Sequence, residues 1–420
     1  MREAQAHEMG LGSNARIVGW GKALPERVLT NRELEQMVET TDQWIRTRTG
    51  IRERRIAGPG ESTLTLAAQA ARHALTTAGV PPARLDLIVV CTFSPEFGGM
   101  PSTASLVQHA VGAERAGAFD LNAACSGFIY GLAMAQAAIV AGLHETVMVV
   151  GAETMSRLLD WKDRSTCVLF GDGAGAVVLQ ATPEQTGMLS CVLGSDGSGG
   201  ELLSVPGGGS RVPATLQSVQ DAQHYIRMNG KEVYKFAVTT LPRAAREAVV
   251  RAGIDVHDVD LFIPHQANVR IIQSAAEALG IPADRIFINV DRYGNTSAAS
   301  IPIALCEAVE QERVRQGDKL LLAGFGGGLS WGAAVVDWSA PVRPAAPVQA
   351  VGSGQWAVGG GQLPVASRRA AGGDSQAGVH GENPAWTPPR RGVWGAGKAA
   401  SVTAPRRRPR RPGRPWAAAA

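Results

Sequence analysis

The chain has 420 residues, 45% of them hydrophobic and 19% charged, which is enough for one large globular core or two fused ones. Fifty Gly beside nine Phe, nine Trp and four Tyr are typical of an α/β protein whose helices pack closely on its sheets. The net charge of +4 is the sum of two unlike parts. Residues 341–420 hold 12 Lys and Arg against two Asp and Glu, whereas residues 1–340 hold 29 Lys and Arg against 35 Asp and Glu. The part that we expect to fold is therefore mildly acidic.

Cysteine usage and hydropathy exclude several classes of protein. The cysteines are five in number and show no short paired spacing, which argues against a disulfide framework or a zinc site and for a reducing compartment. The first residues contain no apolar run of signal-peptide length. The weakly polar stretch 130–143 contains Gln136 and is too short to span a bilayer. We expect a soluble cytoplasmic protein with no metal and no membrane partner.

A basic segment comes early in the chain. The stretch "IRTRTGIRERR" (45–55) holds five arginines in eleven residues and follows Trp44. Such a run is ordinarily a solvated basic face. An indole beside guanidinium groups is also suited to hold a purine and its phosphates, so both interpretations stay open.

Two segments repeat each other. "AARHALTTAGVPPARLDLIVV" (70–90) aligns without a gap on "AAREAVVRAGIDVHDVDLFIP" (244–264). Each copy predicts an amphipathic helix, a Gly stop at Gly79 or Gly253, a short loop and a buried strand. Gly-rich turns followed by Val-rich strands also recur at 170–180 and 324–338. The chain therefore reads as two duplicated α/β halves, 14–185 and 186–340, after a flexible N-terminus, 1–13.

Cys125 lies in "DLNAACSGFIYGL" (120–132), among small residues and before an apolar helical pattern. The pattern places the thiol at a helix N-terminus, where unpaired amides and the positive dipole end favour a thiolate. The small neighbours leave room for a substrate. A buried structural cysteine is the alternative for Cys125, and it is the interpretation for the other four: Cys91, Cys167, Cys191 and Cys306.

Two polar residues of the second half follow similar turns. His265 comes directly after the apolar run "VDLFIP", and Asn295 lies in "YGNTSAAS" before a helix. The repeat offset carries Cys125 to position 299, near Asn295, and Cys91 to His265. Strand ends related by a pseudo-twofold axis would bring Cys125, His265 and Asn295 to one centre, where ligands of such sheets bind. A satisfied core histidine and an ordinary turn asparagine are the alternatives.

Two Gly- or Arg-rich segments have simpler interpretations. "GDGAGA" (171–176) leads into a strand and not a helix, so it fails the dinucleotide fingerprint and indicates close backbone packing. Residues 341–420 are rich in Pro, Gly, Ala and Arg without apolar periodicity, and we expect them to be disordered. This tail is either a basic arm for nucleic acid or acidic lipid, or an unselected extension. We favour the extension because no aromatic motif is interleaved with the arginines.

Together these motifs resemble a known family. "TTDQWIRTRTGIRERRIA", "DLNAACSGFIYGL", "FGDGAGAVVL", "PHQANVRII", "GNTSAASIPIAL" and "GFGGGLSWGAAVV" are similar, in order over about 14–338, to β-ketoacyl-acyl-carrier-protein synthase III. The resemblance implies a thiolase-like α/β fold of five layers, α/β/α/β/α, and a homodimer. It also implies a cofactor-independent acyltransferase that condenses an acyl-CoA starter with malonyl-acyl-carrier protein to initiate fatty acid synthesis.

The resemblance assigns roles to residues by position. Cys125 would be the nucleophile with His265 and Asn295 as partners, and the backbone amides of Cys125 and Gly327 would form the oxyanion hole. The CoA-binding positions would be Trp44, Arg48, Thr49, Arg164 and Asn268. The carrier-protein stretch would be Gln266, Ala267, Asn268, Val269 and Arg270. The acyl pocket would include Phe325 and Met100, the latter at a position often held by Phe and contributed across the dimer.

The same motifs distinguish this chain from related activities. A degradative thiolase would carry a second catalytic cysteine in "GFGGGLSWG", and an elongating condensing enzyme would have a second histidine in place of Asn295. A starter-unit ketosynthase of a polyketide pathway is the runner-up, since its triad would be the same. From a different class, the tail could make the chain a nucleic-acid-binding protein, and the intact triad argues against that.

Overall fold

The computed structural model describes residues 14–340, and the predicted flexible N-terminus and disordered tail lie outside them. Successive side chains of the strands in this region are buried on opposite faces of the sheet. In β4 (Leu87–Cys91), Ile88 and Val90 pack in one apolar cluster, while Val89 and Cys91 pack in another. A strand that buries both faces needs cover on both sides, and the helices supply that cover.

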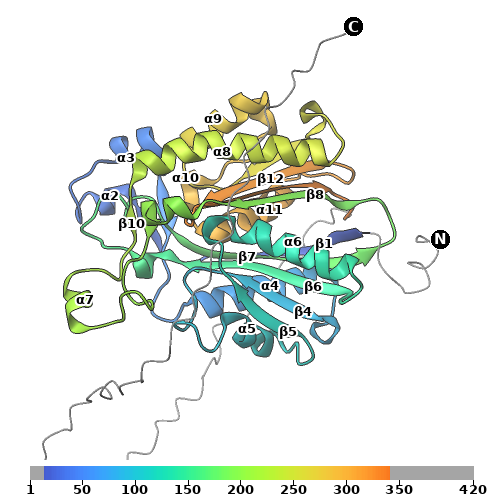
Figure 1. Ribbon diagram of the computed structural model, residues 1–420, viewed down its shortest axis with the longest axis horizontal. Coiled ribbons are helices and arrows are strands. Elements are labelled where there is room, and N and C mark those ends of the chain that lie inside the picture. The colour runs from blue at the N-terminus through green and yellow to red at the C-terminus, as the bar shows by residue number, and fades with distance from the viewer. Residues whose placement is uncertain (1–13, 341–420) are drawn as a thin grey trace, which may run out of the picture. The chain divides into compact units, whose positions relative to one another are not determined.

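Two mixed sheets form the frame (Figure 1). In the first, β4 pairs in parallel with its neighbours on both sides, and the remaining pairs are antiparallel. Its order is β1 (Asn14–Ala23), β7 (Asp172–Thr182), β6 (Thr146–Thr154), β4, β5 (Gly117–Leu121). The second has the order β11 (Leu261–Pro264), β12 (Lys319–Gly326), β13 (Ser330–Asp337), β8 (Gly187–Ser195), with only β11 and β12 parallel.

Three helix pairs complete five layers with the two sheets (Figure 1). The first cluster joins α4 (Thr63–Ala78) and α5 (Thr103–Val111) to the outer face of the first sheet. The middle cluster joins α6 (Gly127–Val140) and α11 (Ser300–Glu310) to both sheets. The last joins α8 (Gly230–Arg251) and α9 (Val269–Leu279) to the second sheet. The predicted α/β/α/β/α fold is confirmed.

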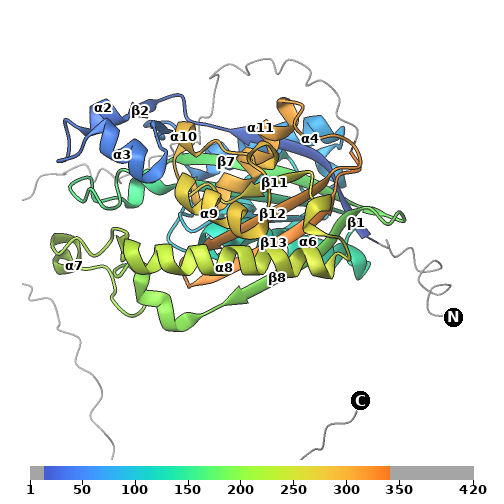
Figure 2. The same cartoon turned by 90° about the horizontal axis from the view of Figure 1, so that it is seen from above.

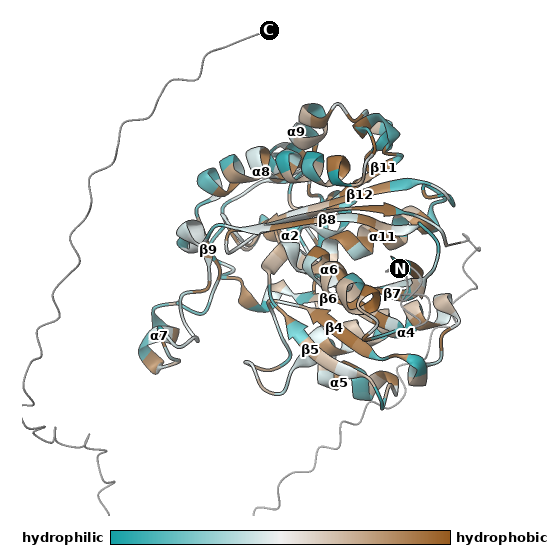
Figure 3. Ribbon diagram, turned by 45° about the vertical axis from the view of Figure 1, so that its right-hand side comes forward, coloured by the Kyte–Doolittle hydropathy of each residue, from teal (hydrophilic) through white to brown (hydrophobic). Residues whose placement is uncertain are grey.

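Hydropathy follows these layers. Figure 3 shows hydrophobic residues along the strands and more hydrophilic ones on α8, which covers the second sheet from outside. Figure 2 shows the length of α8 running along that sheet. The middle helix α6 is apolar over most of its surface and packs in the cluster that joins both sheets, while Met134 and Val140 stay exposed.

The predicted repeat has the same structure in both copies. α4 ends at Ala78, and Gly79 follows with φ +66° before a 3₁₀ turn leads to β4. α8 ends at Arg251, and Ala252 and Gly253, the latter with φ +72°, lead through a 3₁₀ turn to β11. Both Gly residues take the left-handed conformation that L side chains rarely adopt. The strands of the first sheet lie within 14–182 and those of the second within 187–337, and the boundary at 185/186 stays a prediction.

Short elements surround the two sheets at their edges. They include α3 (Asp42–Thr49), which holds Trp44, and α10 (Val290–Tyr293), which precedes Asn295. The others are β2 (Val28–Thr30), α2 (Asn31–Leu34), β3 (Glu53–Arg55), β9 (Leu203–Ser204), α7 (Leu216–Gln220) and β10 (Arg227–Met228). Within 14–340 no helix combines the length and the apolar character needed to cross a bilayer.

Candidate active site

Cys125 lies in a tight turn between β5 and α6. Residues Ala124–Ser126 form a 3₁₀ turn in which Ala124 has φ +46°, and α6 begins at Gly127. The Ala124 N–H donates to the Asn122 side chain at 3.1 Å. A Cβ at Gly127 would lie in ordinary van der Waals contact with Cys91 and Ala298, so the segment that follows Cys125 packs against both halves.

The second half contains a matching turn. Ser297–Ala299 form a 3₁₀ turn before α11, and Ser297 has φ +48°. Aligning the two turns by their left-handed residues makes Ala298 the counterpart of Cys125, one residue before the predicted position 299. The turns also touch, because a Cβ at Gly127 would lie 3.6 Å from the Ala298 Cβ. The pseudo-twofold relation predicted from the repeat thus brings both turns to the centre of the molecule.

Burial dominates the chemistry of the thiol. Cys125 is 5% exposed, and this desolvation raises its pKa to about 12. The Ser297 hydroxyl beside the sulfur lowers the pKa of Cys125, whereas the carboxyl of buried Glu153 raises it further. The helix N-terminus that favours a thiolate is present as predicted, but the unliganded Cys125 is protonated at neutral pH.

His265 is held at the end of β11 with one ring nitrogen free. Its backbone N–H donates to the Ala323 carbonyl at 2.8 Å, and ring Nδ1 lies 2.6 Å from the Ser300 Oγ. Nε2 has no hydrogen-bond partner among residues 14–340. Burial lowers the pKa of the ring to about 3, so the imidazole is neutral at physiological pH. Phe325 meets this ring edge-on at a centroid distance of 5.6 Å.

Asn295 is fixed through its backbone and its amide oxygen. Its N–H donates to Leu169 O at 2.8 Å, and its carbonyl accepts from Gly171 N–H at 3.0 Å. The side-chain Oδ1 accepts the Ser297 N–H at 2.8 Å. Because the oxygen is occupied, the Nδ2 amino group is the end available to a ligand.

Glycines of β12 lie close to Cys125 and His265. A Cβ at Gly324 would lie 3.5 Å from Cys125 O and 3.7 Å from His265 Cβ, and one at Gly326 would lie 2.6 Å from Cys125 N. A side chain at Gly324 would therefore lie between Cys125 and His265, and one at Gly326 would collide with the Cys125 backbone. Asn295 joins the group through Ser297, which also borders Cys125.

A hydroxyl pair joins the two turns that could supply oxyanion donors. Ser330 Oγ lies 2.8 Å from Ser126 Oγ, 2.9 Å from Ala123 O and 3.0 Å from Gly327 O. Both hydroxyls are buried. They connect the turn of Cys125 to the 326–330 turn, so the backbone amides of Cys125 and Gly327 are held in one rigid unit.

A small apolar cavity opens beside the thiol. Its volume is about 50 Å³, and its lining includes Cys125, Gly327 and Ser297 with apolar residues from both halves: Phe93, Ala124, Met155, Phe170, Leu203 and Ile226, as well as Ser204. Phe325 and Met100 do not line it. Met100 is 89% exposed in the single chain, and its place in an acyl pocket stays a prediction.

The predicted CoA-binding residues come from α3, from the N-cap of α9 and, for Arg164, from the segment between β6 and β7. Two guanidinium groups lie over the Trp44 ring, Arg48 at 5.6 Å and Arg164 at 5.5 Å from its centroid. Asn268 Nδ2 donates to Arg48 O at 3.0 Å, which joins α3 to the N-terminus of α9. The buried Thr49 hydroxyl donates to Ile45 O, so this side chain supports the helix end and does not face the surface.

The structure contradicts the prediction for one residue of the carrier-protein stretch, Gln266. Gln266 is 1% exposed, and its Nε2 donates to Pro264 O and Phe287 O, while Oε1 accepts from Asn289 N and Val290 N. A buried, fully paired amide cannot contact a docking protein. The part of the stretch that reaches the surface is Ala267, Asn268, Val269 and Arg270.

The Gly-rich stretch 171–176 has the predicted role. A Cβ at Gly171 would lie 2.3 Å from Tyr293 O, and one at Gly175 would lie 2.7 Å from Ile303 N. The stretch thus packs against α11 and the end of α10, the two elements that flank Asn295.

Sequence reasoning missed four buried polar residues of the site: Glu153, Ser297, Ser300 and Ser330. Ser297 and Ser300 lie within "GNTSAAS", so their nearness in sequence to Asn295 was a usable signal. Glu153 lies in β6 and Ser330 in β13, and no sequence signal pointed to either residue.

A buried cysteine where two such α/β halves meet defines a thiolase-like condensing fold. Residues 119–197 match the sequence profile of 3-oxoacyl-[acyl-carrier-protein] synthase III, and residues 249–338 match that of its C-terminal part. A β-ketoacyl-[acyl-carrier-protein] synthase III of Roseiflexus castenholzii is 55% identical over 326 residues, 78% of this chain and 98% of the relative. The chain belongs to the β-ketoacyl-acyl-carrier-protein synthase III family.

Two solved structures share this fold at moderate sequence identity. The 3-oxoacyl-[acyl-carrier-protein] synthase III from Aquifex aeolicus VF5 superposes with a TM-score of 0.72 at 47% identity, over 77% of this chain and 100% of that one. The priming β-ketosynthase of the R1128 polyketide biosynthetic pathway has a TM-score of 0.73 at 38% identity, over 79% and 98%.

Proposed function

We propose that this protein condenses a short acyl-CoA starter with malonyl-acyl-carrier protein, with loss of carbon dioxide, through an acyl-Cys125 intermediate. The product is a 3-oxoacyl-acyl-carrier protein, and the reaction initiates fatty acid synthesis. The observation that carries the proposal is the buried Cys125 beside a small cavity and next to a neutral His265 with a free Nε2. Family membership supplies the reaction class.

The first step is a thioester exchange. The Cys125 sulfur forms a bond to the acyl carbon, the bond from that carbon to the CoA sulfur breaks, and the thiol proton ends on CoA. The reaction therefore begins with one thiol, Cys125, and ends with another, that of CoA. A Cys125 that is protonated in the unliganded protein is compatible with such an exchange. The amides of Cys125 and Gly327 would stabilise the oxyanion of the tetrahedral intermediate.

The second step needs hydrogen-bond donors that do not protonate a carbanion. When the malonyl carboxylate leaves as carbon dioxide, its electron pair forms an enolate whose oxygen would accept from His265 Nε2–H and Asn295 Nδ2. The enolate carbon then attacks acyl-Cys125, the carbon–sulfur bond breaks, and the released thiolate takes a proton from water. A neutral ring and an amide are weak acids, so the carbanion survives long enough to attack.

The two substrates would dock on α3 and α9. The indole of Trp44 with the guanidinium groups of Arg48 and Arg164 close to it supports adenine stacking and phosphate pairing with acyl-CoA. The exposed Arg270, at the start of α9, supports docking of an acidic helix of the carrier protein. A local basic site of this kind reconciles an acidic partner with a mildly acidic folded region.

The proposed homodimer uses the edge of the first sheet. β5 is the last strand of that sheet, and its Phe119 is 41% exposed, an unusual exposure for an aromatic residue on an edge strand. Pairing of β5 with a second copy would cover this residue. Met100 could then reach the cavity of the partner chain, as the family resemblance predicts.

A starter ketosynthase of a polyketide pathway is the second candidate, and the R1128 structure supports it. The fatty acid enzyme is favoured, because the relatives at 47% and 55% identity carry that name and the priming ketosynthase is 38% identical.

The test is peptide mass spectrometry after incubation with a panel of acyl-CoA donors and no carrier protein. We expect one adduct, on the Cys125 peptide, and the fastest donor names the starter. Cys125→Ser should abolish the adduct, whereas Asn295→Ala should keep it and lose most decarboxylative condensation. If Asn295→Ala lost acylation to the same degree as Cys125→Ser, the role assigned to Asn295 would be wrong. Absence of any adduct with both CoA and carrier donors would overturn the proposed activity.

A further inference from the structure

The His265 ring has an unequal environment at its two nitrogens. Nδ1 lies 2.6 Å from Ser300 Oγ, and Nε2 has no partner among residues 14–340. Both residues are almost fully buried, at 1% and 2% exposure. A neutral imidazole carries a single ring hydrogen, so the partner at Nδ1 decides what Nε2 can do.

The hydrogen-bond partners of Ser300 indicate which atom is the donor in its contact with His265 Nδ1. The Ser300 Oγ also accepts the Gln266 backbone N–H at 3.4 Å, and Nδ1 is the only acceptor for its own hydrogen within the described region. If Nδ1–H donated instead, the buried hydroxyl hydrogen would have no acceptor, and Nε2 would be a buried acceptor without a donor. Buried polar groups left unpaired in this way are costly.

We propose that Ser300 is a positioning residue that donates to His265 Nδ1 and thereby holds the ring in the tautomer with hydrogen on Nε2. The inference rests on the proposed function, in which Nε2–H must donate to the enolate oxygen. Ser300 itself contacts neither substrate nor the reacting atoms. It acts only through the ring, as the orienting partner of a catalytic histidine does elsewhere.

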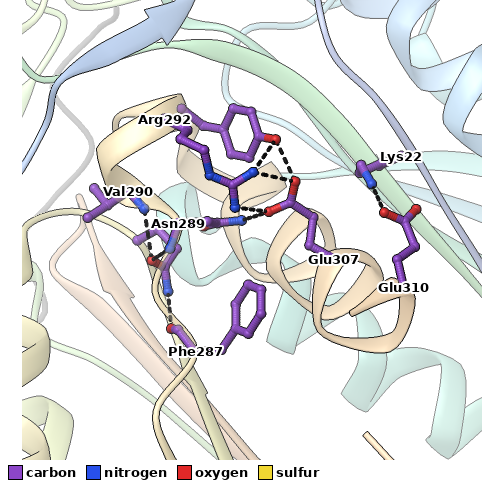
Figure 4. A network of polar contacts seen from close by, with 9 residues as sticks. Lys22, Phe287, Asn289, Val290, Arg292, Glu307 and Glu310 are labelled. Carbon is purple, nitrogen blue, oxygen red and sulfur yellow. Dashed lines mark hydrogen bonds and ion pairs between the residues drawn. The ribbon is translucent and has the colours of Figure 1, made fainter. Parts of the chain in front are cut away.

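Helix α11 makes this arrangement rigid. Ser300 begins the helix, and Glu307 lies seven residues later on the same face. Buried Glu307 accepts from Asn289 Nδ2 at 2.9 Å and from Arg292 at 2.7 Å (Figure 4). Asn289 N in turn donates to Gln266 Oε1 at 3.0 Å, next to His265. Gln266, the residue that follows His265, is therefore linked through Asn289 and Glu307 to the same helix that carries Ser300.

The two half-reactions should depend on Ser300 differently. Acylation uses Cys125 and the oxyanion amides, and no hydrogen bond to the His265 ring enters that step. Decarboxylation needs the Nε2 hydrogen. Loss of the hydroxyl should leave acylation near its normal rate and slow decarboxylation on the order of 10–100-fold, the range found when a second-layer partner of a functional histidine is removed.

The experiment compares Ser300→Ala with Ser190→Ala, a buried serine whose hydroxyl donates to Ala248 O on the outer side of the second sheet. Acyl-Cys125 formation from acyl-CoA and carbon dioxide release from malonyl-carrier protein are measured separately. Ser300→Thr, which keeps the hydroxyl, should restore decarboxylation. Nitrogen-15 NMR of histidine-labelled wild-type protein at neutral pH should show hydrogen on Nε2 of His265, assigned with His265→Asn.

Three outcomes overturn the proposal. Hydrogen on Nδ1 in the wild type would do so even if Ser300→Ala failed to fold. Decarboxylation by Ser300→Ala within twofold of Ser190→Ala would do so, as would an equal loss of acylation and decarboxylation. A wild-type chain without either half-reaction would overturn the proposed function, and the NMR result would still decide the tautomer.

Discussion

At the scale of single residues, loss of water controls both titratable groups of the site. Burial raises the pKa of Cys125 to about 12 and lowers that of His265 to about 3, so each group is held neutral. A neutral His265 suits the enolate step, as the sequence predicted from the chemistry. A neutral Cys125 differs from the thiolate that the helix N-terminus predicted, since the dipole end is offset by desolvation and by the Glu153 carboxyl.

The raised pKa predicts how Cys125 reacts with iodoacetamide. Only the thiolate is alkylated, and a pKa of about 12 means that its fraction grows about tenfold per pH unit over the whole accessible range. We expect the alkylation rate, followed by mass spectrometry of the Cys125 peptide, to rise from pH 7 to pH 10 without a plateau. Cys125→Ala gives the background from the other cysteines. A plateau below pH 8 would show that the N-terminus of α6 outweighs burial.

At the scale of elements, two features of the site follow from local sequence and one does not. The small residues of 122–127 predicted the tight turn before α6, and the 70–90 and 244–264 repeat predicted helix, Gly, loop and strand in both halves. Gln266 was different, because "PHQAN" gives no sign that its side chain turns inward. Its four partners come from 264 and 287–290, and only the folded chain brings the second group to it.

The glycines of β12 give a prediction for this element. A Cβ at Gly326 would lie 2.6 Å from the Cys125 amide nitrogen, so Gly326→Ala must displace one of the two backbones. We expect acylation to fall about 100-fold or more, the cost of losing an oxyanion donor. Acyl-enzyme formation is measured by mass spectrometry, and folding by circular dichroism. Gly60→Ala is the control, since nothing lies within 4 Å of its Cβ. Normal acylation by Gly326→Ala would contradict the proposed oxyanion geometry.

At the scale of the whole molecule, the site exists only because two halves meet. Cys125 comes from the first half, and His265 and Asn295 come from the second. Residues of both line the cavity. The Trp44 surface likewise combines α3 with α9 through the Asn268 contact to Arg48. The mildly acidic folded region and the basic 341–420 tail are separate in sequence, and the proposed chemistry uses only the first.

Truncation tests this separation. We expect a chain ending at residue 340 to keep acylation and condensation within about twofold, because all proposed site residues precede that point. Activity, chain mass and binding to duplex DNA at low and high salt are compared between full-length and truncated protein. Loss of activity on truncation would show that the tail is functional. Salt-sensitive DNA binding by the full chain alone, unaffected by Cys125→Ala, would favour the nucleic-acid interpretation.

The sequence by itself predicted an α/β fold class, the repeat and the candidate site residues Cys125, His265 and Asn295, because motif residues and periodicity are local properties of the chain. The tertiary structure decided the rest: the protonation of Cys125, the burial of Gln266, and the partners Ser300, Glu153 and Ser330. These depend on desolvation and on contacts between segments up to about two hundred residues apart, such as Ser126 with Ser330. No local pattern encodes which buried donor will find which acceptor.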